Sequence, residues 1–105
     1  MKLGGLPPSK VFTEEASRAL KKLEVSPAKE GLLKQVRKSL GYLQTNPRHP
    51  SLNTHPYSSI DNPFDPSQKV FEAYAQNQTP GAYRIFWCYG PRKDEITIIA
   101  ITPHP

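Results

Sequence analysis

Two side chains in the C-terminal quarter of the sequence, Arg84 and His104, are the first candidates for chemistry. Arg84 is the lone charge in the apolar run that starts at Tyr83, and its planar guanidinium matches the geometry of phosphate. His104 follows the last apolar run, and histidine is the side chain that titrates near neutral pH without perturbation. We therefore expect the functional site at this pair. The alternatives are a structural salt bridge between Arg84 and Glu72, and a frayed chain end at His104.

The elements that position this pair are predicted to be β-strands. Residues 79–81 (TPG) are typical of a turn, because proline fixes φ and glycine adopts backbone shapes that other residues avoid. The strand that follows alternates, with Tyr83, Ile85 and Trp87 on one face and Arg84, Phe86 and Cys88 on the other. Residues 89–94 reverse the chain. Residues 70–75 form a further strand that precedes the turn.

The most β-prone run of the chain is residues 95–102. Strict alternation would put Ile96, Ile98 and Ala100 on one face, and Thr97, Ile99 and Ile101 on the other. Because both faces are largely apolar, we expect a central strand that is covered on at least one side.

The N-terminal half is predicted to be helical after a tether over residues 1–9 and a short strand over residues 10–12. Thr13 is a suitable N-cap, and Ser26 followed by Pro27 favours the start of a second helix. Asn46 followed by Pro47 ends that helix. Apolar side chains recur at helical spacing in both segments: Ala16, Ala19, Leu20 and Leu23, then Leu32, Leu33, Val36, Leu40 and Leu43. The short connection favours an antiparallel helical hairpin.

Residues 47–69 form a long proline-rich loop without periodicity, and a compact domain seldom keeps such a loop without using it. The resulting order is β-α-α-β-β-β. We expect one α+β domain over residues 1–105, in which the helical hairpin packs on one face of a C-terminal antiparallel β-meander and the other face stays wet.

Charge and cysteine usage limit the classes of function. The sequence holds 14 Lys and Arg against 9 Asp and Glu, a net charge of +5, which suits nucleic acid or an acidic partner protein. Cys88 is the only cysteine, so an internal disulfide is excluded, and its apolar surroundings favour a buried, inert thiol. No zinc-ligand spacing, signal peptide or membrane-spanning run is present. We expect a cytoplasmic protein without a metal or cofactor.

Several segments follow one another in an informative order: residues 11–16 (VFTEEA) with 19–23 (ALKKL), 43–47 (LQTNP), 51–55 (SLNTH), 82–87 (AYRIFW) and 96–102 (ITIIAIT), the last leading into His104. In this order they resemble the RelE/ParE superfamily of bacterial toxin–antitoxin toxins. The resemblance covers most of the chain. It implies a toxin that a small acidic antitoxin neutralises. The toxin would form a hetero-oligomer with that antitoxin or a homodimer with a second copy of itself. The RelE- and YoeB-like branches imply a metal-independent endoribonuclease that cuts mRNA on the ribosome, whereas the ParE-like branch implies inhibition of DNA gyrase.

The resemblance also implies roles for individual residues. Arg84 matches the arginine of the nuclease branch, and His104 matches the C-terminal histidine of YoeB-like toxins, which suits the general acid. The position that carries the family's glutamate base is occupied here by Pro50 and Ser51, so Glu72 or His55 is left as the candidate base. Without a base, the chain would be a weakened, basic binding domain. The candidates for binding RNA are Arg48, Lys69, Tyr74, Arg92 and Lys93.

Overall fold

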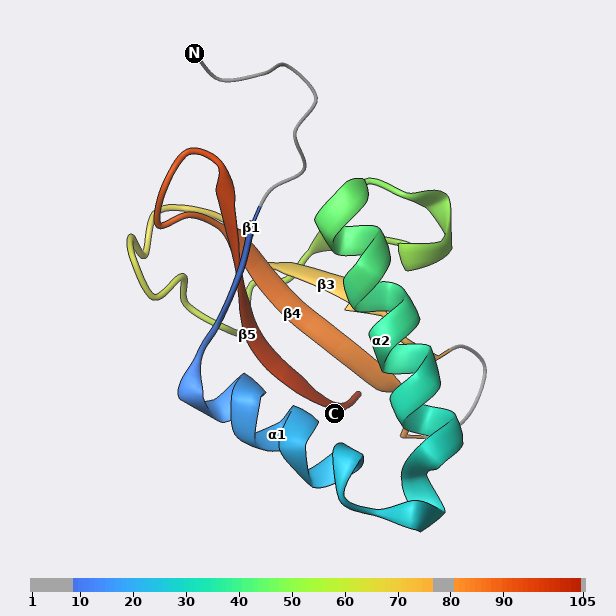
Figure 1. The fold of residues 1–105 in the computed structure, drawn as a ribbon. Helices are drawn as coiled ribbons and strands as arrows, with labels where there is room; N and C mark the ends of the chain where they lie inside the picture. The colour runs from blue at the N-terminus through green and yellow to red at the C-terminus, as the bar shows by residue number, and fades with distance from the viewer. Residues whose placement is uncertain (1–8, 77–80, 105) are drawn as a thin grey trace.

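The computed structural model describes residues 9–76 and 81–104 (Figure 1). Its elements are β1 (Ser9–Phe12), α1 (Glu14–Glu24), the 3₁₀ turn η1 (Pro27–Lys29), α2 (Glu30–Thr45), the 3₁₀ turn η2 (Pro50–Leu52), β2 (His55–Pro56), β3 (Phe71–Tyr74), β4 (Tyr83–Tyr89) and β5 (Glu95–Pro103). The predicted α+β order is confirmed. The predicted tether is wrong at Ser9, which belongs to β1, and residues 1–8 of that tether lie outside the described residues.

The five strands form one sheet in the order β1-β5-β4-β3-β2. The meander of β3, β4 and β5 is antiparallel, as predicted, and β1 pairs in parallel with β5. The predicted loop over residues 47–69 is not entirely irregular, because it contains η2 and the two-residue strand β2, which pairs with β3. Two residues carry no periodicity, so β2 could not be predicted from pattern.

The local signals at the helix ends are confirmed in part. The Thr13 hydroxyl accepts a hydrogen bond from the Ala16 amide at 3.1 Å and caps α1. Ser26 occupies the N-cap position and Pro27 begins the helical segment, as predicted, but the Ser26 side chain makes no cap bond and the segment starts as a 3₁₀ turn before α2. In that turn the Lys29 amide donates instead to the Ser26 carbonyl. Helix α2 ends at Thr45, one residue before Asn46.

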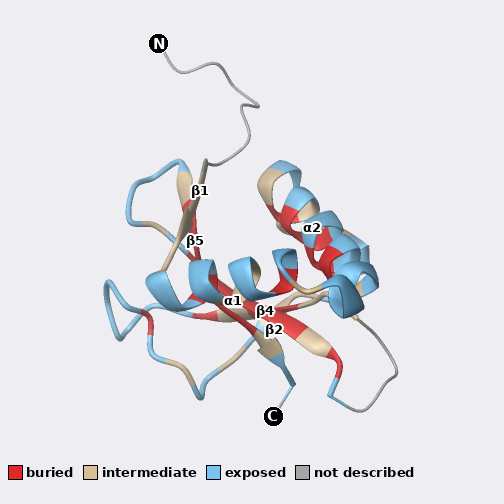
Figure 2. Ribbon diagram, turned by 60° about the horizontal axis from the view of Figure 1, so that its bottom comes forward, coloured by how far each residue is buried: buried red, intermediate tan, exposed pale blue. Residues whose placement is uncertain are grey.

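Both helices cover the same face of the sheet, which we call the helix face (Figure 1). Figure 2 shows that the buried residues of the helices lie on the sides that face the sheet. The predicted contact of this strand face with the helices is confirmed, since Ile85 and Trp87 share one core with residues of both helices, including Leu23, Val36 and Leu40. Tyr83 packs at the margin of that core.

The opposite face, which we call the loop face, is not simply wet. Val70, Phe86, Cys88 and Ala100 form a second buried cluster there, and Tyr57 and Ile60 of the segment after β2 cover it. The expectation of an open second face is therefore wrong where this segment folds over the sheet. The remainder of the loop face carries polar and charged side chains.

The predicted faces of β5 are wrong beyond Ile98. Trp87 of β4 pairs with Ile98, but Phe86 pairs with Ala100, so Ile99 is an extra residue in β5. A β-bulge of this kind reverses the alternation of all later side chains. Ile101 therefore joins the helix-face core, and Ala100 joins the cluster on the loop face.

Candidate functional site

A buried carboxylate lies at the centre of the site. Glu72 of β3 is 2% exposed. Its Oε1 lies 2.7 Å from Nε2 of His55, and its Oε2 lies 2.9 Å from Nδ1 of His104. Nε of Arg84 lies 3.8 Å from the same Oε2. Three residues from three separate strands or strand ends thus surround one carboxylate, and all four belong to the predicted catalytic set.

Strand pairing brings these residues together on the loop face. His55 lies directly opposite Glu72 in the β2–β3 pair, and Arg84 lies opposite Tyr74 in the β3–β4 pair. His104 follows β5, and its backbone amide donates to the carbonyl of Ala82 at 2.8 Å. The residue is therefore held by the sheet, and it is not a frayed end.

The imidazole of His55 is committed on both sides. Its Nδ1 lies 2.8 Å from the carbonyl oxygen of Asn53, and its Nε2 faces Glu72. A carbonyl and a carboxylate both accept hydrogen bonds, so both contacts are satisfied only when both ring nitrogens donate, as in the imidazolium form. In this arrangement His55 has no nitrogen left to take a proton from a substrate.

The imidazole of His104 has one nitrogen available. Nδ1–H donates to Glu72, whereas Nε2 makes no hydrogen bond within residues 9–76 and 81–104. The side chain is 45% exposed, so Nε2 is open to a ligand. A buried carboxylate that fixes the tautomer of a histidine leaves the other ring nitrogen ready to exchange a proton. Glu72 and His104 form such a dyad.

The Arg84 guanidinium is largely buried and fixed by several contacts, although its predicted role is to bind phosphate. Its side chain is 10% exposed, and Nη1 donates to the carbonyl of Gln76 at 2.7 Å. The guanidinium carbon lies 3.8 Å from the centre of the Tyr74 ring, which is cation–π geometry. Nε is buried without a hydrogen-bond partner, although Glu72 is close. Arg84 therefore brings a fixed positive charge beside Glu72, and its Nη1 is already committed to the carbonyls of Gln76 and Tyr83.

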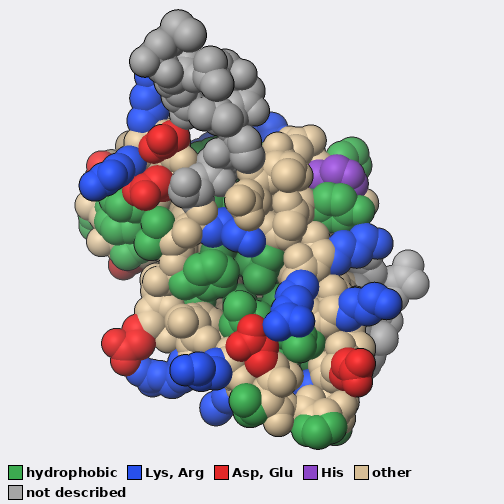
Figure 3. Space-filling model, viewed as in Figure 1, with side chains coloured by type: hydrophobic (Ala, Val, Ile, Leu, Met, Phe, Trp, Pro, Cys, Tyr) green, Lys and Arg blue, Asp and Glu red, His purple; other side chains and the backbone are tan. Residues whose placement is uncertain are grey.

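The predicted RNA-binding residues are dispersed. Tyr74 belongs to the site, where it stacks against Arg84 and meets the His55 ring edge-on at 5.9 Å. Arg92 and Lys93 lie in the turn between β4 and β5, about 20 Å along β4 from Arg84. Arg48 and Lys69 are exposed, at either end of the loop. On the face that Figure 3 shows, basic side chains are spread over the surface with acidic ones among them.

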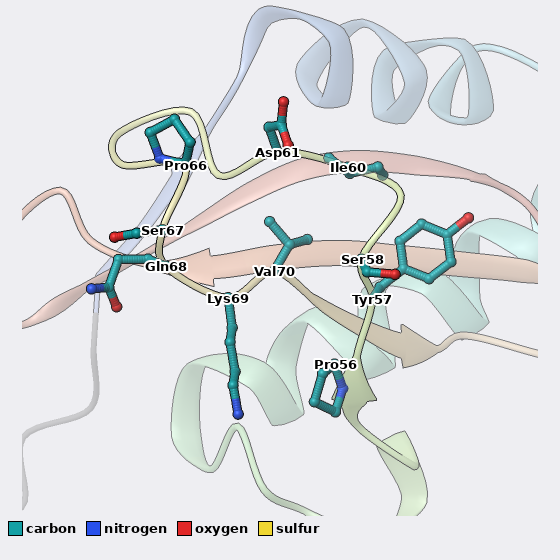
Figure 4. Close-up of a pocket in the computed structure, with 10 residues that line it drawn as sticks. All are labelled: Pro56, Tyr57, Ser58, Ile60, Asp61, Pro66, Ser67, Gln68, Lys69 and Val70. Atoms are coloured by element: carbon teal, nitrogen blue, oxygen red, sulfur yellow. The ribbon is translucent and has the colours of Figure 1, made fainter.

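A hollow lies beside the site on the loop face (Figure 4). Its volume is about 490 Å³, and it is enclosed by two stretches of the loop, residues 56–61 and 66–70. Val70 lies in its floor, directly before β3, and it points to the same face as Glu72 and Tyr74 because alternate residues of an extended chain share a face. Lys69 and Gln68 stand at the rim. The hollow and the site are thus neighbours on a continuous surface.

Metal and thiol chemistry find little support in the described part of the chain. Two histidines and a glutamate meet, but the imidazole nitrogens that point inward contact the two Glu72 oxygens directly. No group of three or more His, Cys, Asp or Glu side chains in the described ranges could hold a metal ion. Burial raises the pKa of the Cys88 thiol to about 11, which suppresses the thiolate near neutral pH. No helix among the described residues is long and apolar enough to cross a membrane.

Two supporting residues were not anticipated from sequence. The first is Asn53, whose carbonyl oxygen contacts Nδ1 of His55. Asn53 directly follows η2 and has a φ of 49°. Asparagine tolerates this left-handed conformation better than most residues, which was the available signal. The second is Gln76, whose backbone carbonyl accepts a hydrogen bond from Arg84. Any residue has such a carbonyl, so the residue type gives no signal for this contact.

No protein-family model and no curated protein matches this chain. Solved structures do. A YoeB/ParE toxin from Agrobacterium tumefaciens aligns with a TM-score of 0.66 at 9% identity, over 92% of this chain and 99% of the other. A YoeB dimer from Staphylococcus aureus gives 0.67 at 11% identity, over 94% and 99%. A RelE–RelB complex from Pyrococcus horikoshii gives 0.61 at 12% identity, over 92% and 94%. The chain therefore has the fold of the RelE/ParE superfamily of toxins.

Proposed function

We propose that this chain is the toxin of a toxin–antitoxin pair and that it cuts mRNA, on the ribosome, without a metal ion. The observation that carries the proposal is the dyad of Glu72 and His104, in which a buried carboxylate orients an exposed imidazole. Binding to another protein would not by itself require an exposed imidazole whose second nitrogen is open to a ligand. A YoeB dimer and a RelE–RelB complex among the structural relatives support a self-association or an antitoxin partner.

The reaction is an attack of the ribose 2′-hydroxyl on the neighbouring phosphate. The bond from O2′ to phosphorus forms, the bond from phosphorus to O5′ breaks, and the products end in a 2′,3′-cyclic phosphate and a 5′-hydroxyl. The 2′-hydroxyl loses its proton to a base, and protonated His104 gives the Nε2 proton to the departing O5′. Glu72 stabilises the imidazolium and keeps Nε2 turned outward.

The charges around Glu72 suit an anionic substrate. One carboxylate meets Arg84 and two histidines, so the cluster is positive when His55 is an imidazolium. A phosphate that approaches Nε2 of His104 would meet this excess charge, which is the condition for stabilising a phosphorane. The neighbouring hollow would receive an adjacent nucleotide, with Lys69 at its rim.

Glu72 and His55, the two candidates for the general base, differ in the contacts that each would have to break. Glu72 is 3% exposed in its side chain, and both oxygens already contact histidines, so it acts better as an orienting group. His55 can act as base only in a neutral form that has released one of its two partners, the Asn53 carbonyl or the Glu72 carboxylate. RNA binding would therefore have to break one of these contacts.

One observation favours a second candidate, a toxin of the ParE kind that inhibits DNA gyrase by binding. Arg84 is largely buried and donates to a backbone carbonyl, which is the behaviour of a structural arginine. Such a chain, or a basic binding domain with weakened catalysis, would keep the dyad as an internal tie between strands.

Cleavage assays separate these functions. The wild-type protein should cut reporter mRNA in a purified translation system, and His104→Ala should lower turnover by roughly 10²–10⁴. With RNA alone as the substrate, where a chelator cannot disturb ribosomes, removal of metal ions should leave the rate of cleavage unchanged. A single 2′-deoxy nucleotide at the cut site should block cleavage and leave binding intact, because the nucleophile belongs to the RNA. Intact mRNA together with loss of gyrase supercoiling would replace the nuclease with the ParE-like function.

A further inference from the structure

The placement of His104 depends on the bulge in β5. Before the bulge, Ile96 and Ile98 face the helices. Thr102 has the same parity, yet it pairs with Arg84 on the loop face, and His104 reaches Glu72 on that face. An uninterrupted strand would have turned the even-numbered residues, His104 included, toward the helix face. The extra residue Ile99 thus decides on which side of the sheet the imidazole lies.

Thr13 holds this bulge from the other end of the sequence. Its backbone amide donates to the carbonyl of Ile98 at 3.0 Å, and its hydroxyl donates to the carbonyl of Ile99 at 2.7 Å. β1 ends at Phe12, so the strand ladder supplies no further donor beside the bulge. A part-buried carbonyl without a partner is costly, and the Thr13 hydroxyl removes that cost at the bulged residue itself.

The same hydroxyl also caps α1. It accepts from the Ala16 amide at 3.1 Å while it donates to Ile99. A hydroxyl can do both because it carries one donor hydrogen and two lone pairs. The start of the first helix and the bulge in the last strand are therefore fixed by one oxygen atom.

We propose that Thr13 is a positioning residue for His104, which acts by fixing the Ile99 bulge that turns the imidazole toward Glu72. Thr13 lies on the side of β5 away from Arg84 and touches neither Glu72 nor His104. Its effect on RNA cleavage rests on the function proposed above, whereas its effect on the place of His104 does not.

Three substitutions separate the two tasks of the hydroxyl. Thr13→Ser keeps the donor and the acceptor. Thr13→Asp keeps the cap, since aspartate accepts from helix amides, but it cannot donate to Ile99 and sets a negative charge against that carbonyl. Thr13→Val removes both functions with little change of shape. Amide hydrogen exchange and the imidazole NMR signals of His104 report on its position in the intact protein.

In Thr13→Asp and Thr13→Val, we expect exchange at the His104 amide to rise at least about tenfold, with loss of the Nδ1–H signal toward Glu72, while the β5 segment before the bulge stays protected. We expect Thr13→Ser to match the wild type. RNA cleavage should fall about 10²-fold in Thr13→Asp, the cost of an ångström-scale misplacement.

A folded Thr13→Asp protein with unchanged His104 signals would overturn the proposal. So would a Thr13→Ser protein as perturbed as Thr13→Val, or an unfolded Thr13→Asp protein, since Thr13 would then serve the fold as a whole. If the wild type cuts no RNA while the NMR results are as expected, the nuclease function fails and the positioning role of Thr13 stands.

Discussion

Replacing Glu72 by glutamine tests the centre of the site. One amide offers a single carbonyl oxygen, so only one of the two histidines can continue to donate to it. The other must face an NH₂ group and turn its own lone pair inward. His55 can be that residue without losing its other contact, because its Nδ1–H can still donate to the Asn53 carbonyl while Nε2 accepts from the amide. In either arrangement, the substitution removes the carboxylate that stabilises the imidazolium of His104.

The expected loss of stability follows from the two contacts. Hydrogen bonds that involve a charged group are worth about 1.5–3 kcal/mol, against about 0.5–1.5 for neutral ones. Exchanging two of them costs roughly 2–3 kcal/mol, which is below the usual range for breaking a buried pair because both histidines are nearly half exposed. In a chain of this size the melting temperature should fall by roughly 10–20 °C.

Urea unfolding followed by the fluorescence of Trp87, the single tryptophan, measures this change, because Trp87 is 1% exposed in the folded protein. The matched control is Glu15→Gln, an exposed glutamate on α1, which should stay within about 0.5 kcal/mol of the wild type. In the cleavage assay, Glu72→Gln should lose roughly 10²–10⁴ in turnover, as expected for a catalytic histidine whose imidazolium has lost its carboxylate partner. A Glu72→Gln protein as stable as the control would refute the charged network.

Three further changes test other parts of the structure. Leu40→Ala should cost about 2–5 kcal/mol in urea unfolding by opening a cavity in the helix-face core, and a loss under 1 kcal/mol would contradict the packing. Cys88 should resist alkylation at pH 8, because its pKa is raised to about 11. For the same reason the free energy of unfolding should be full below pH 9 and fall as pH rises from 9 to 11, by up to about 1.4 kcal/mol per pH unit. An equal decline in Cys88→Ala would show another cause. Arg84→Lys, assayed for binding and turnover with cleavable RNA, should keep binding and lose roughly 10²–10³ in turnover, whereas lost stability with unchanged turnover would identify Arg84 as structural.

The sequence by itself determined the elements whose signals are local. The hydroxyl of Thr13 before a helical stripe predicted the start of α1, and Asn46 before Pro47 predicted the end of α2. The positions from Tyr83 to Cys88 predicted both faces of β4, because successive side chains of an uninterrupted strand point to opposite faces.

Only the tertiary structure decided how the site is assembled. The run from Ile96 to Ile101 is apolar on both faces, so it carries no alternation from which a bulge at Ile99 could be located. Glu72 and His104 are separated by 32 residues, and their contact requires the strand pairing and the bulge together. Periodicity records the environment of single residues, whereas register is a property of strand pairs, and the candidate site depends on register.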